Sequence, residues 1–428
     1  MNENSVYRGN SGIRVRLTER KFTGLRFDDM KYIAIIGFGV VGGGIAAVLE
    51  ENKAAVSAAV GEDVELKYIL DLREFPDSPW GDRVVHTIDP IVNDPDVALV
   101  CETMGGSHPA LEYTMQLLSA GKSVVTSNKE VVANFGDKML ACAAEHGVNY
   151  LFEASVGGGI PVIRSMLTSL AGDNICRIDG ILNGTTNYIL TRMRDEGSDY
   201  ADVLADAQKL GYAEKDPSAD VDGIDAQRKI IILTALATGK LVPAEKVYAE
   251  TMRTISAEDM AGAKKCGGAV KLIGSARMSD EGVALFVAPR IVPDTCQLSH
   301  IDDVYNGIAV TTPLLGDVLY YGRGAGRFPT ASAVVADVCA VLSGAAMKEK
   351  RPVFTADCEH VVDFDEIWFT YYVRFADAVQ MEKLTALADT VEKLDEKEFV
   401  IGKMGRRALA DLWEKLGVTP VSVIRILE

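Results

Sequence analysis

The chain has 428 residues, of which 48% are hydrophobic and 25% charged, a composition typical of a folded protein with two or three domains. Its formal charge of −17, from 44 basic and 61 acidic residues, argues against binding to nucleic acid or to an anionic membrane surface. Seven cysteines lie far apart without a CxxC pair, and no apolar run reaches the roughly 18 residues of a membrane span, so we expect reduced thiols in a cytoplasmic protein.

Residues 1–30 mix basic and acidic side chains without a hydrophobic period, and they lack the apolar stretch of a signal peptide. We interpret this segment as a poorly ordered extension. Met30 directly precedes the first strand pattern, so it is an alternative start of the protein.

Short apolar runs alternate with helix-period segments over residues 31–150. Strands that alternate with helices indicate an α/β fold whose parallel sheet is covered on both faces. The expected strands are Tyr32–Ile36, Leu66–Leu70, Val97–Cys101, Ser123–Thr126 and Asn149–Phe152, and the expected helices lie around Ile45–Leu49, Ala110–Ala120 and Asp137–His146.

A GxGxxG motif directly follows the first of these strands and opens a helix, which is the context of a dinucleotide-binding turn. It consists of Gly37, Phe38, Gly39, Val40, Val41 and Gly42. Gly37 makes the tight turn, Gly39 lets the backbone approach a pyrophosphate, and Gly42 permits close contact between helix and strand. The free N–H groups of the helix start favour an anion. The alternative is a glycine-rich turn in another kind of α/β sheet.

Two charged residues, Asp71 and Arg73, follow the second strand. An acid at this place binds the ribose hydroxyls of NAD, whereas a nearby arginine accommodates the 2′-phosphate of NADP. Because both are present, the cofactor is either NAD or NADP. The distance in sequence from Gly42 to Asp71 also exceeds the usual spacing of about 20 residues.

Lys129 ends the run that begins at Thr126, directly after the fourth strand. Since the carboxyl ends of parallel strands face the ligand crevice, we expect Lys129 to contact the cofactor or to polarise a substrate oxygen. A solvated lysine at a helix start is the alternative. The uncharged polar run Asn183–Tyr188 is equally compatible with a capped helix start and with a substrate-binding loop.

A third polar cluster spans residues 211–229. A helix that begins near Asp222 would place Asp222, Asp225 and Lys229 on one face. The residues that follow, Ile230–Leu233, are apolar on every side and predict a buried helix. Burial lowers the pKa of a lysine toward the working range of a proton donor. The alternative is a structural Asp–Lys pair.

The remainder of the chain shows mixed α and β character up to about residue 325, followed by a long apolar helix over Thr330–Leu342 that could pack on the first domain. After residue 352 the composition changes, and the pattern predicts a small separate module of β-α-β-α-β order. Its expected elements are a strand at Phe369–Phe375, a charged helix at Met381–Leu394, a strand at Phe399–Gly402, a helix at Arg406–Leu416 and a strand at Val421–Leu427.

Several motifs, in this order, closely resemble the homoserine dehydrogenase family over about residues 31–342. They are GFGVVGGG at the first turn, ETMGG (Glu102–Gly106), GKSVVTSNKE (Gly121–Glu130), FEASVGGGIP (Phe152–Pro161), ILNGTTNYIL (Ile181–Leu190), GYAEKDPSADVDGIDAQRK (Gly211–Lys229) and YYGRGAGRFPTA (Tyr320–Ala331). The resemblance implies an α/β fold with a Rossmann-type parallel sheet over residues 31–150, completed by about 320–345. It also implies a mixed α+β catalytic and dimerisation domain over 151–320.

The resemblance further implies the reversible, NAD- or NADP-dependent oxidation of L-homoserine to L-aspartate 4-semialdehyde in threonine, methionine and isoleucine biosynthesis, by a homodimer or homotetramer. Glu214 and Asp225 match residues that bind the amino and hydroxyl ends of homoserine. Lys229 matches the proton donor, and Lys129 a lysine that contacts cofactor and substrate. Their joint presence speaks against a catalytically silent NAD-binding regulator. A dehydrogenase of another small amino-acid aldehyde or imine remains the alternative enzyme.

Other positions carry over in the same way. Thr103, Gly211 and Gly324 match cofactor-contacting residues. The backbone carbonyls of Glu153, Val156, Gly158 and Ile160 match a site for a monovalent cation, Na⁺ or K⁺. Members of the family often have arginine where Leu70 stands, so the resemblance implies no preference for NADP, and Arg73 is the possible substitute.

The C-terminal residues 352–428 resemble the ACT domain, the feedback module of many homoserine dehydrogenases, and Val423–Ile426 is typical of its last strand. The stretch Ala376–Leu384 contains neither Gly nor Pro and runs straight into a helix pattern. It therefore lacks the turn that usually forms the amino-acid-binding corner. The module also has one strand fewer than the family pattern. We expect it to have kept a role in packing or assembly and to have lost feedback by threonine.

Overall fold

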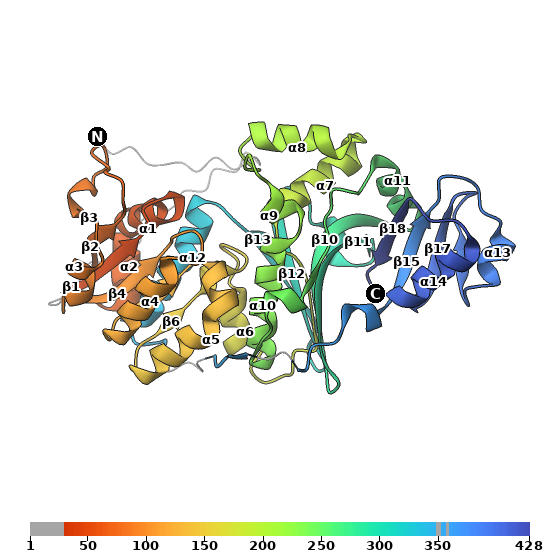
Figure 1. Ribbon diagram of the computed structural model, residues 1–428. Helices are drawn as coiled ribbons and strands as arrows, with labels where there is room; N and C mark the ends of the chain where they lie inside the picture. The colour runs from red at the N-terminus through yellow and green to blue at the C-terminus, as the bar shows by residue number, and fades with distance from the viewer. Residues whose placement is uncertain (1–29, 348–351, 357–358) are drawn as a thin grey trace.

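A computed structural model of the chain describes residues 30–347, 352–356 and 359–428. These residues form three α/β units in a row (Figure 1). The extension predicted for residues 1–29 lies outside the described residues, whereas Met30 already belongs to the first strand. Within the described ranges, no helix combines the length and the apolar character that crossing a bilayer requires.

The first unit is built on a parallel six-stranded sheet with strand order β3-β2-β1-β4-β5-β6. The direction of strand succession reverses between β1 and β4, and ligands bind outside the carboxyl ends of strands at such a point. All five strands expected from the sequence are present. The six strands are β1 (Met30–Ile36), β2 (Asp63–Leu70), β3 (Val84–Val85), β4 (Val97–Glu102), β5 (Ser123–Thr126) and β6 (Tyr150–Leu151).

Helices cover both faces of this sheet. Ile33 and Ile35 of β1 pack into one hydrophobic cluster with α1, α2 and α12, and Ala34 and Ile36 pack on the opposite face with α4 and α5. The helix predicted over Thr330–Leu342 is present as α12 and packs against α1, far from it in sequence. The helices of this unit are α1 (Val40–Glu51), α2 (Lys53–Val60), α3 (Asp89–Asn93), α4 (Ala110–Ser119), α5 (Lys129–Glu145) and α12 (Arg327–Leu342).

Helix α5 begins at Lys129, whereas the apolar pattern predicted that it begins near Asp137. The side chain of Asn128 accepts hydrogen bonds from the N–H groups of Glu130 and Val131 and thereby caps the helix. The capped first turn brings Lys129 to the carboxyl edge of the sheet.

The second unit consists of helices packed on one face of a larger, mixed sheet. Its strands are β7 (Arg177–Ile181), β9 (Tyr248–Ala249), β10 (Gly268–Ser279), β11 (Gly282–Pro293), β12 (Tyr305–Thr312) and β13 (Gly316–Arg323), and the short β8 (Lys240–Leu241) pairs with β14 (Thr355–Ala356). Its helices are α6 (Val162–Thr168), α7 (Gly184–Glu196), α8 (Tyr200–Lys209), α9 (Ser218–Val221), α10 (Ile224–Thr238) and α11 (Ala257–Lys265).

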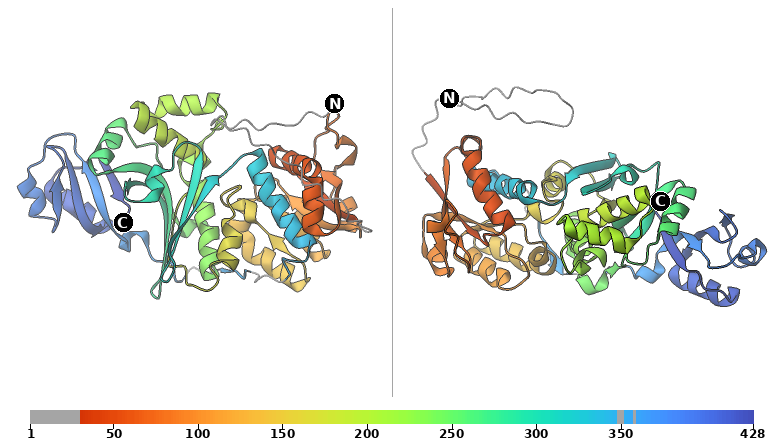
Figure 2. Two further views of the ribbon diagram at one scale, coloured as in Figure 1. Left: turned by 180° about the vertical axis from the view of Figure 1, so that it is seen from behind. Right: turned by 90° about the horizontal axis from the view of Figure 1, so that it is seen from above.

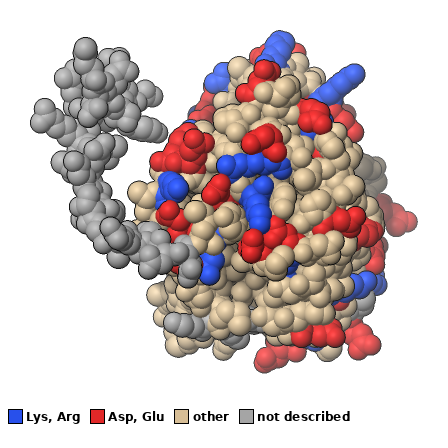
Figure 3. Space-filling model, turned by 90° about the vertical axis from the view of Figure 1, so that its left-hand side faces the viewer, with Lys and Arg blue, Asp and Glu red and all other residues tan. Residues whose placement is uncertain are grey.

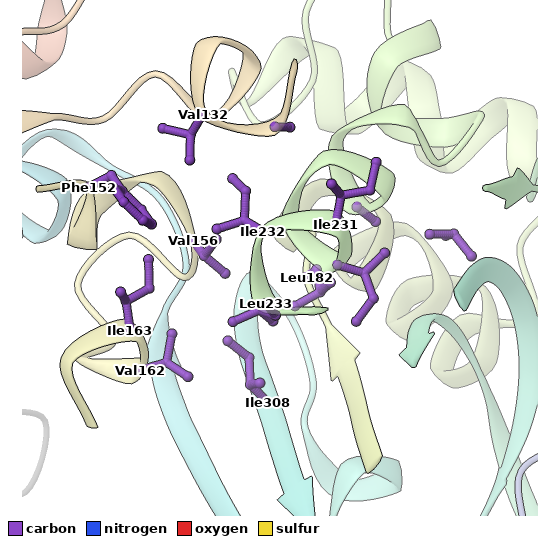
Figure 4. Packing of buried hydrophobic residues seen from close by; sticks show 14 of the residues in the cluster. Val132, Phe152, Val156, Val162, Ile163, Leu182, Ile231, Ile232, Leu233 and Ile308 are labelled. Atoms are coloured by element: carbon purple, nitrogen blue, oxygen red, sulfur yellow. The ribbon is translucent and has the colours of Figure 1, made fainter. Parts of the chain in front are cut away.

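Helix α10 is the centre of this unit. Ile230, Ile231, Ile232 and Leu233 are all fully buried, as the all-round apolar pattern predicted. In Figure 4, residues Ile231–Leu233 lie between Val132 of the first unit and Ile308 of strand β12. Burying each such side chain contributes about 1.5–3 kcal/mol, so the polar residues at the start of this helix stand on a rigid support.

The C-terminal module differs from the sequence prediction in its middle. The charged helix expected over Met381–Leu394 is wrong: a five-residue helix is followed by a loop and by strand β16, which pairs with β17. The module therefore has four strands, and the prediction that one strand is lacking is also wrong. Its elements are β15 (Trp368–Arg374), α13 (Met381–Thr385), β16 (Val391–Lys393), β17 (Glu398–Gly405), α14 (Arg406–Leu416) and β18 (Ser422–Ile426).

The β-α-β-β-α-β succession and the strand order β18-β15-β17-β16 are those of a split β-α-β arrangement. The module is not structurally separate. Arg425 and Ile426 of β18 pair in parallel with Arg290 and Ile291 of β11, so its strands continue the sheet of the second unit. The two turned views in Figure 2 show the strands of both units running side by side into one sheet.

Candidate active site

A cleft of about 530 Å³ opens where the first and second units meet. It lies at the carboxyl edge of the parallel sheet, as the strand reversal requires. Three stretches singled out in the sequence converge on it: the run ending at Lys129, the run beginning at Asn183, and the cluster ending at Lys229. Its wall consists of Val40, Val41, Ser127, Lys129, Ala154, Ser155, Gly158, Asn183, Gly184, Thr185, Gly211, Tyr212, Asp220, Asp225, Lys229, Val304, Arg323, Gly324, Ala325, Gly326 and Thr330.

The helix that carries Asp225 and Lys229 starts later than the sequence suggested. Gly223 adopts φ +79°, a left-handed conformation that favours glycine, and α10 begins at Ile224. Asp222 lies before this turn and pairs with Arg253 at 2.8 Å on the surface, so the prediction that it shares the functional face is wrong. Asp225 and Lys229, one helical turn apart, do share that face.

Asp225 is buried between two lysines. Its Oδ1 lies 2.7 Å from Nζ of Lys129, and its Oδ2 lies 2.7 Å from Nζ of Lys229. Lys229 also donates to the carbonyl of Leu182 at 2.7 Å, and Asn183 donates to Oδ2 of Asp225 at 2.9 Å. The arrangement holds two ammonium groups and one carboxylate at the wall of a cleft.

The charges in this cluster alter one another's protonation. Burial would raise the pKa of the Asp225 carboxyl, but the two ammonium groups hold it well below its usual range. Burial lowers the pKa of Lys229, and Lys129 lowers it further, against the opposing attraction of Asp225. Lys229 is therefore a more acidic ammonium group than a free lysine.

Two neighbouring residues of the cleft were not assigned a role from the sequence. Asp220 lies in the cleft wall and accepts a hydrogen bond from Asn183 at 2.7 Å; burial and the charge of Asp225 raise its pKa. Asn183 is also the cap of α7, since its side chain accepts from the N–H of Thr186 at 2.9 Å. The polar run is therefore a capped helix start whose first residues also line the cleft. The spacing of Asp220 to Asp225 in a loop before a helix could have signalled the acid.

The other predicted substrate residue, Glu214, lies away from these groups. It is exposed in the loop between α8 and α9 and does not line the cleft, although Gly211 and Tyr212 of the same loop do. Gly324, predicted to contact the cofactor, lines the cleft as well.

The dinucleotide turn has the geometry that the motif requires. Gly37 has φ +86°, a Cβ on Gly42 would lie 2.2 Å from the Gly37 carbonyl oxygen, and a Cβ on Gly39 would meet nothing within 4 Å. No side chain caps α1, so the N–H groups of its first turn have no side-chain acceptor and are available to an anion. Thr103 closes the turn by donating to the Gly37 carbonyl at 2.7 Å. These residues fit a bound pyrophosphate.

Asp71 and Arg73 meet beside this turn. Asp71 Oδ2 accepts from the N–H of Phe38 at 2.8 Å, and Arg73 donates to both carboxylate oxygens at 2.9 and 2.8 Å. The Arg73 guanidinium holds the pKa of Asp71 well below its usual range. Arg73 itself is mostly exposed, so it is free to turn toward a ligand.

The segment with the four carbonyls predicted to bind a cation, residues 153–160, is buried apart from the exposed Gly159. The carboxylate of Glu153 accepts from the N–H groups of Ile163 and Arg164 at 2.9 and 2.7 Å and so caps α6. The carbonyl of Ile160 accepts from Val162 at 2.9 Å, which leaves one of its lone pairs free.

Acidic and basic side chains alternate on the face of the first unit shown in Figure 3, without an extended patch of one sign.

Profiles of one protein family cover most of the chain. The profile described as homoserine dehydrogenase matches residues 161–339, and that described as the homoserine dehydrogenase NAD binding domain matches residues 37–153. A homoserine dehydrogenase of Synechocystis sp. is 41% identical over 355 residues, which cover 80% of this chain and 82% of that protein. One of Mycobacterium tuberculosis is 35% identical over 388 residues, 88% of each protein.

Solved structures agree with these matches. A homoserine dehydrogenase from Thiobacillus denitrificans superposes with a TM-score of 0.86 at 31% identity and covers 94% of this chain and 99% of that one. A hyperthermophilic archaeal homoserine dehydrogenase in complex with NADPH superposes with a TM-score of 0.65 at 27% identity, covering 76% and 100%. The chain belongs to the homoserine dehydrogenase family of NAD(P)-dependent oxidoreductases.

Proposed function

We propose that this chain interconverts L-homoserine and L-aspartate 4-semialdehyde in the cleft between its first two units, with Lys229 exchanging the proton. The observation that carries this proposal is the Lys129–Asp225–Lys229 cluster at the cleft wall beside the dinucleotide turn. A buried ammonium group with a lowered pKa is suited to give and take a proton near neutral pH.

A bound nicotinamide cofactor supplies the hydride in the reductive direction and accepts it in the oxidative one. As the hydride adds to the aldehyde carbon, the carbonyl electron pair moves to the oxygen, which takes a proton from Nζ of Lys229. In the reverse direction neutral Lys229 accepts the hydroxyl proton. Lys129 stabilises negative charge on the same oxygen, and Asp225 fixes both lysines in place.

The carboxylates at the cleft are suited to the ammonium group of the substrate. Asp220 lines the cleft with one oxygen bonded to Asn183, which leaves acceptor capacity for a ligand. We assign Glu214 to the same end of homoserine, reached by movement of the loop that also carries Gly211 and Tyr212. Asp225 contacts the reacting hydroxyl.

The cofactor preference is decided at the Asp71–Arg73 pair. Asp71 faces the position of the adenosine ribose beside Phe38, and Arg73 is the adjacent exposed cation. Arg73 exchanges its bond with Asp71 for the 2′-phosphate of NADP, while Asp71 receives the ribose hydroxyls of NAD. Both cofactors are therefore substrates of this enzyme.

A monovalent cation, Na⁺ or K⁺, braces the joint between the units at the carbonyls of Glu153, Val156, Gly158 and Ile160. Burial of this segment and its hydrogen bond from Gly159 to Arg323 of β13 support such a role. Turnover in K⁺ or Na⁺ salts should then exceed turnover in a salt of a bulky organic cation.

We further propose a homodimer, or a tetramer built from it, through the sheet face opposite α10. On β13 every second residue is exposed, including Leu319 and Tyr321, while Val318 and Tyr320 pack inward on the main core. Exposed apolar side chains on a sheet face favour a second copy. All six described cysteines are free thiols, which supports a cytoplasmic location.

The test of the proposed function is the homoserine-dependent reduction of NAD and of NADP by the purified chain. Lys129→Ala and Lys229→Ala should each lose turnover with both cofactors. Arg73→Ala should lower the ratio of kcat/KM for NADP to that for NAD by about 10-fold or more, as loss of a charged hydrogen bond implies. A ratio that does not change would remove Arg73 from cofactor selection.

A further inference from the structure

Glu102 is a fully buried carboxylate at the end of the central strand β4. In the sheet it stands opposite Ile36 of β1 and Thr126 of β5. These two neighbours directly precede the dinucleotide turn and the loop that leads to Lys129. Glu102 therefore lies where both ligand-facing loops leave the sheet, although no step of the proposed reaction uses it.

Both oxygens of Glu102 accept hydrogen bonds at this edge of the sheet, one from the end of β5 and one from the loop that follows β4 itself. The hydroxyl of Thr126 donates to Oε2 at 2.6 Å, and the N–H of Met104 donates to Oε1 at 2.7 Å. The Thr126 hydroxyl in turn accepts from the N–H of Asn128 at 2.8 Å. One carboxylate thus fixes the first residues of two loops.

The contacts continue to the reaction cluster. Asn128 donates from its side chain to the Gly106 carbonyl at 2.9 Å, which joins the two loops, and it caps the helix that starts with Lys129. The Lys129 ammonium then lies 2.7 Å from Asp225. A displacement of Thr126 and Asn128 would therefore move the base of the Lys129 side chain.

We propose that Glu102, in its ionised form, is a positioning residue that holds Lys129 in register with Asp225 and Lys229. The proposal rests on the role assigned above to Lys129.

The donors around Glu102 require a carboxylate. Thr126 has a single hydroxyl proton, and its oxygen already accepts from Asn128, so this proton is directed to Glu102. The N–H of Met104 is fixed by the backbone. Protonation of Glu102 would add a third donor, the carboxyl O–H, directed at the hydroxyl of Thr126 or at the N–H of Met104. One of these buried donors would then lose its hydrogen-bond partner. Protonation of Glu102 therefore loosens the loop of Lys129.

The pKa of Glu102 brings this change close to neutral pH. Burial raises the pKa to about 7, against the hydrogen bonds from Thr126 and Met104, which lower it. The titratable group facing it from β6 is Tyr150, whose buried hydroxyl has no hydrogen-bond partner among the described residues. Burial and then the charge of Glu102 raise the pKa of that hydroxyl well above its usual value, so it stays neutral.

Glu130, the acidic residue in the first turn of α5, forms an ion pair with Arg228 and a hydrogen bond with Ser107. The sign of the stability effect follows from the raised pKa. Between the pKa of the unfolded chain and about 7, the folded chain binds more protons, so stability falls as pH rises. At pH 8 the ionised carboxylate lowers stability while it orders the loop.

The first test compares three threonine variants by their pH profiles of kcat in the reductive direction, in which Lys229 must be protonated and therefore limits turnover only at high pH. Thr126→Val removes one hydrogen bond to the ionised form of Glu102, so the acidic limb of the kcat profile should move to higher pH. At pH values below that limb, kcat should fall about 10- to 100-fold, as when a group that orients a functional side chain is removed. Thr126→Ser retains the hydroxyl and should restore the wild-type profile. Thr114→Val is the matched control, because Thr114 is also fully buried but its hydroxyl has no partner among the described residues.

The second test is Glu102→Gln, whose side chain cannot ionise. We expect this variant to have a low kcat and a pH profile without the acidic limb. Its melting temperature at pH 8 should be no lower than that of the wild type. A wild-type kcat profile in this variant, or an unmoved limb in Thr126→Val, would overturn the proposal for Glu102. Wild-type turnover in Lys129→Ala would instead overturn the role of Lys129, so the two failures are distinct.

Discussion

At the residue scale, the two lysines of the cleft differ mainly in their access to water. The Lys229 side chain is 8% exposed and that of Lys129 is 37% exposed, yet both lie 2.7 Å from the same carboxylate. Desolvation disfavours the charged form of the buried Lys229 and lowers its pKa. We therefore propose proton exchange for Lys229 and contact with ligands at the cleft mouth for Lys129.

Replacing Lys229 with alanine should abolish turnover and leave NAD(P) binding nearly unchanged. The side chain contacts Asp225 and the carbonyl of Leu182 but none of the residues of the dinucleotide turn. Loss of a positioned proton donor lowers kcat about 10²–10⁴-fold. Steady-state kinetics and the fluorescence titration of NAD(P)H measure the two quantities, with the exposed Lys246→Ala as control. A variant that keeps more than a tenth of the wild-type kcat would refute the assignment.

The two carboxylates proposed for the substrate ammonium group can be compared directly. Asp220→Asn should raise the KM for homoserine at unchanged KM for NAD(P), because Asp220 already lines the cleft. Glu214→Gln should raise it as well, since the loop must bring Glu214 to the substrate. Each lost charged contact corresponds to about 10-fold or more. An effect in Asp220→Asn alone would show that Glu214 is only a loop residue.

At the scale of elements, helix α10 is held between two left-handed glycines. Gly223 precedes it with φ +79°, and Gly239 follows it with φ +74°. The first sets the position of Asp225 at the cleft, while the second lies at the opposite end of the helix. Both glycines have the same backbone requirement, but only Gly223 lies at the cleft end of the helix. The same substitution at the two positions is therefore a matched comparison.

Gly223→Ala and Gly239→Ala should each destabilise the protein by about 1–2 kcal/mol, the cost of a left-handed conformation for a residue with a side chain. A Cβ at Gly223 would also lie 3.1 Å from Val287, whereas one at Gly239 would meet the Val353 carbonyl only at 3.4 Å. Only Gly223→Ala should lower kcat, because it alone shifts Asp225. Denaturant unfolding and kinetics at one temperature test this. Equal kcat losses in both variants would show that the helix moves as a whole.

At the scale of the whole molecule, the C-terminal module is part of the catalytic core. Besides the shared sheet, Arg425 pairs with Glu250 at 2.6 Å, and Arg374 pairs with Asp259 at 2.9 Å. The Asp259 carboxylate is fully buried, and Phe286 of β11 packs in the module's own hydrophobic cluster. Such an interface is a continuous core and not a docking contact.

Removal of residues 363–428 should therefore destabilise what remains. It would uncover Phe286 and the edge of β11, and it would leave Asp259 without its cation, a loss of about 3–5 kcal/mol for a buried pair. We expect a lower melting temperature and a smaller soluble fraction. Lys393→Ala, which removes an exposed ion pair of the module, should change stability by less than about 1 kcal/mol. A soluble truncated chain with wild-type melting temperature and kcat would contradict this.

Feedback by threonine should be absent. The corner between β15 and α13 is a short loop, not the direct helix start expected from the sequence, but two of its N–H groups, of Phe375 and Val379, already donate to the carbonyls of Lys397 and Glu396. Without differential contacts to a ligand there is no coupling free energy. The initial rate should be unchanged in millimolar L-threonine. Cooperative inhibition that vanishes in a module variant such as Val379→Asp would prove the opposite.

The sequence alone determined those features that arise from local pattern and from short spacing. Alternation of apolar runs and helices predicted the parallel sheet, and the glycine motif predicted the turn at Gly37. All-round apolarity predicted that Ile230–Leu233 is buried. The one-turn spacing of Asp225 and Lys229 predicted that they share one helix face.

Tertiary structure decided what depends on residues distant in the chain. Charged residues 381–394 have helical character, but strand β17 lies beside their second half, and pairing with it outweighs local propensity. Parallel pairing of β18 with β11 likewise has no local signal. The approach of Lys129 to Asp225, the entry of Asp220 into the cleft and the burial of Glu102 require three separate segments to pack together. Local pattern carries no information on that packing, because contact energies arise only when the units fold against each other.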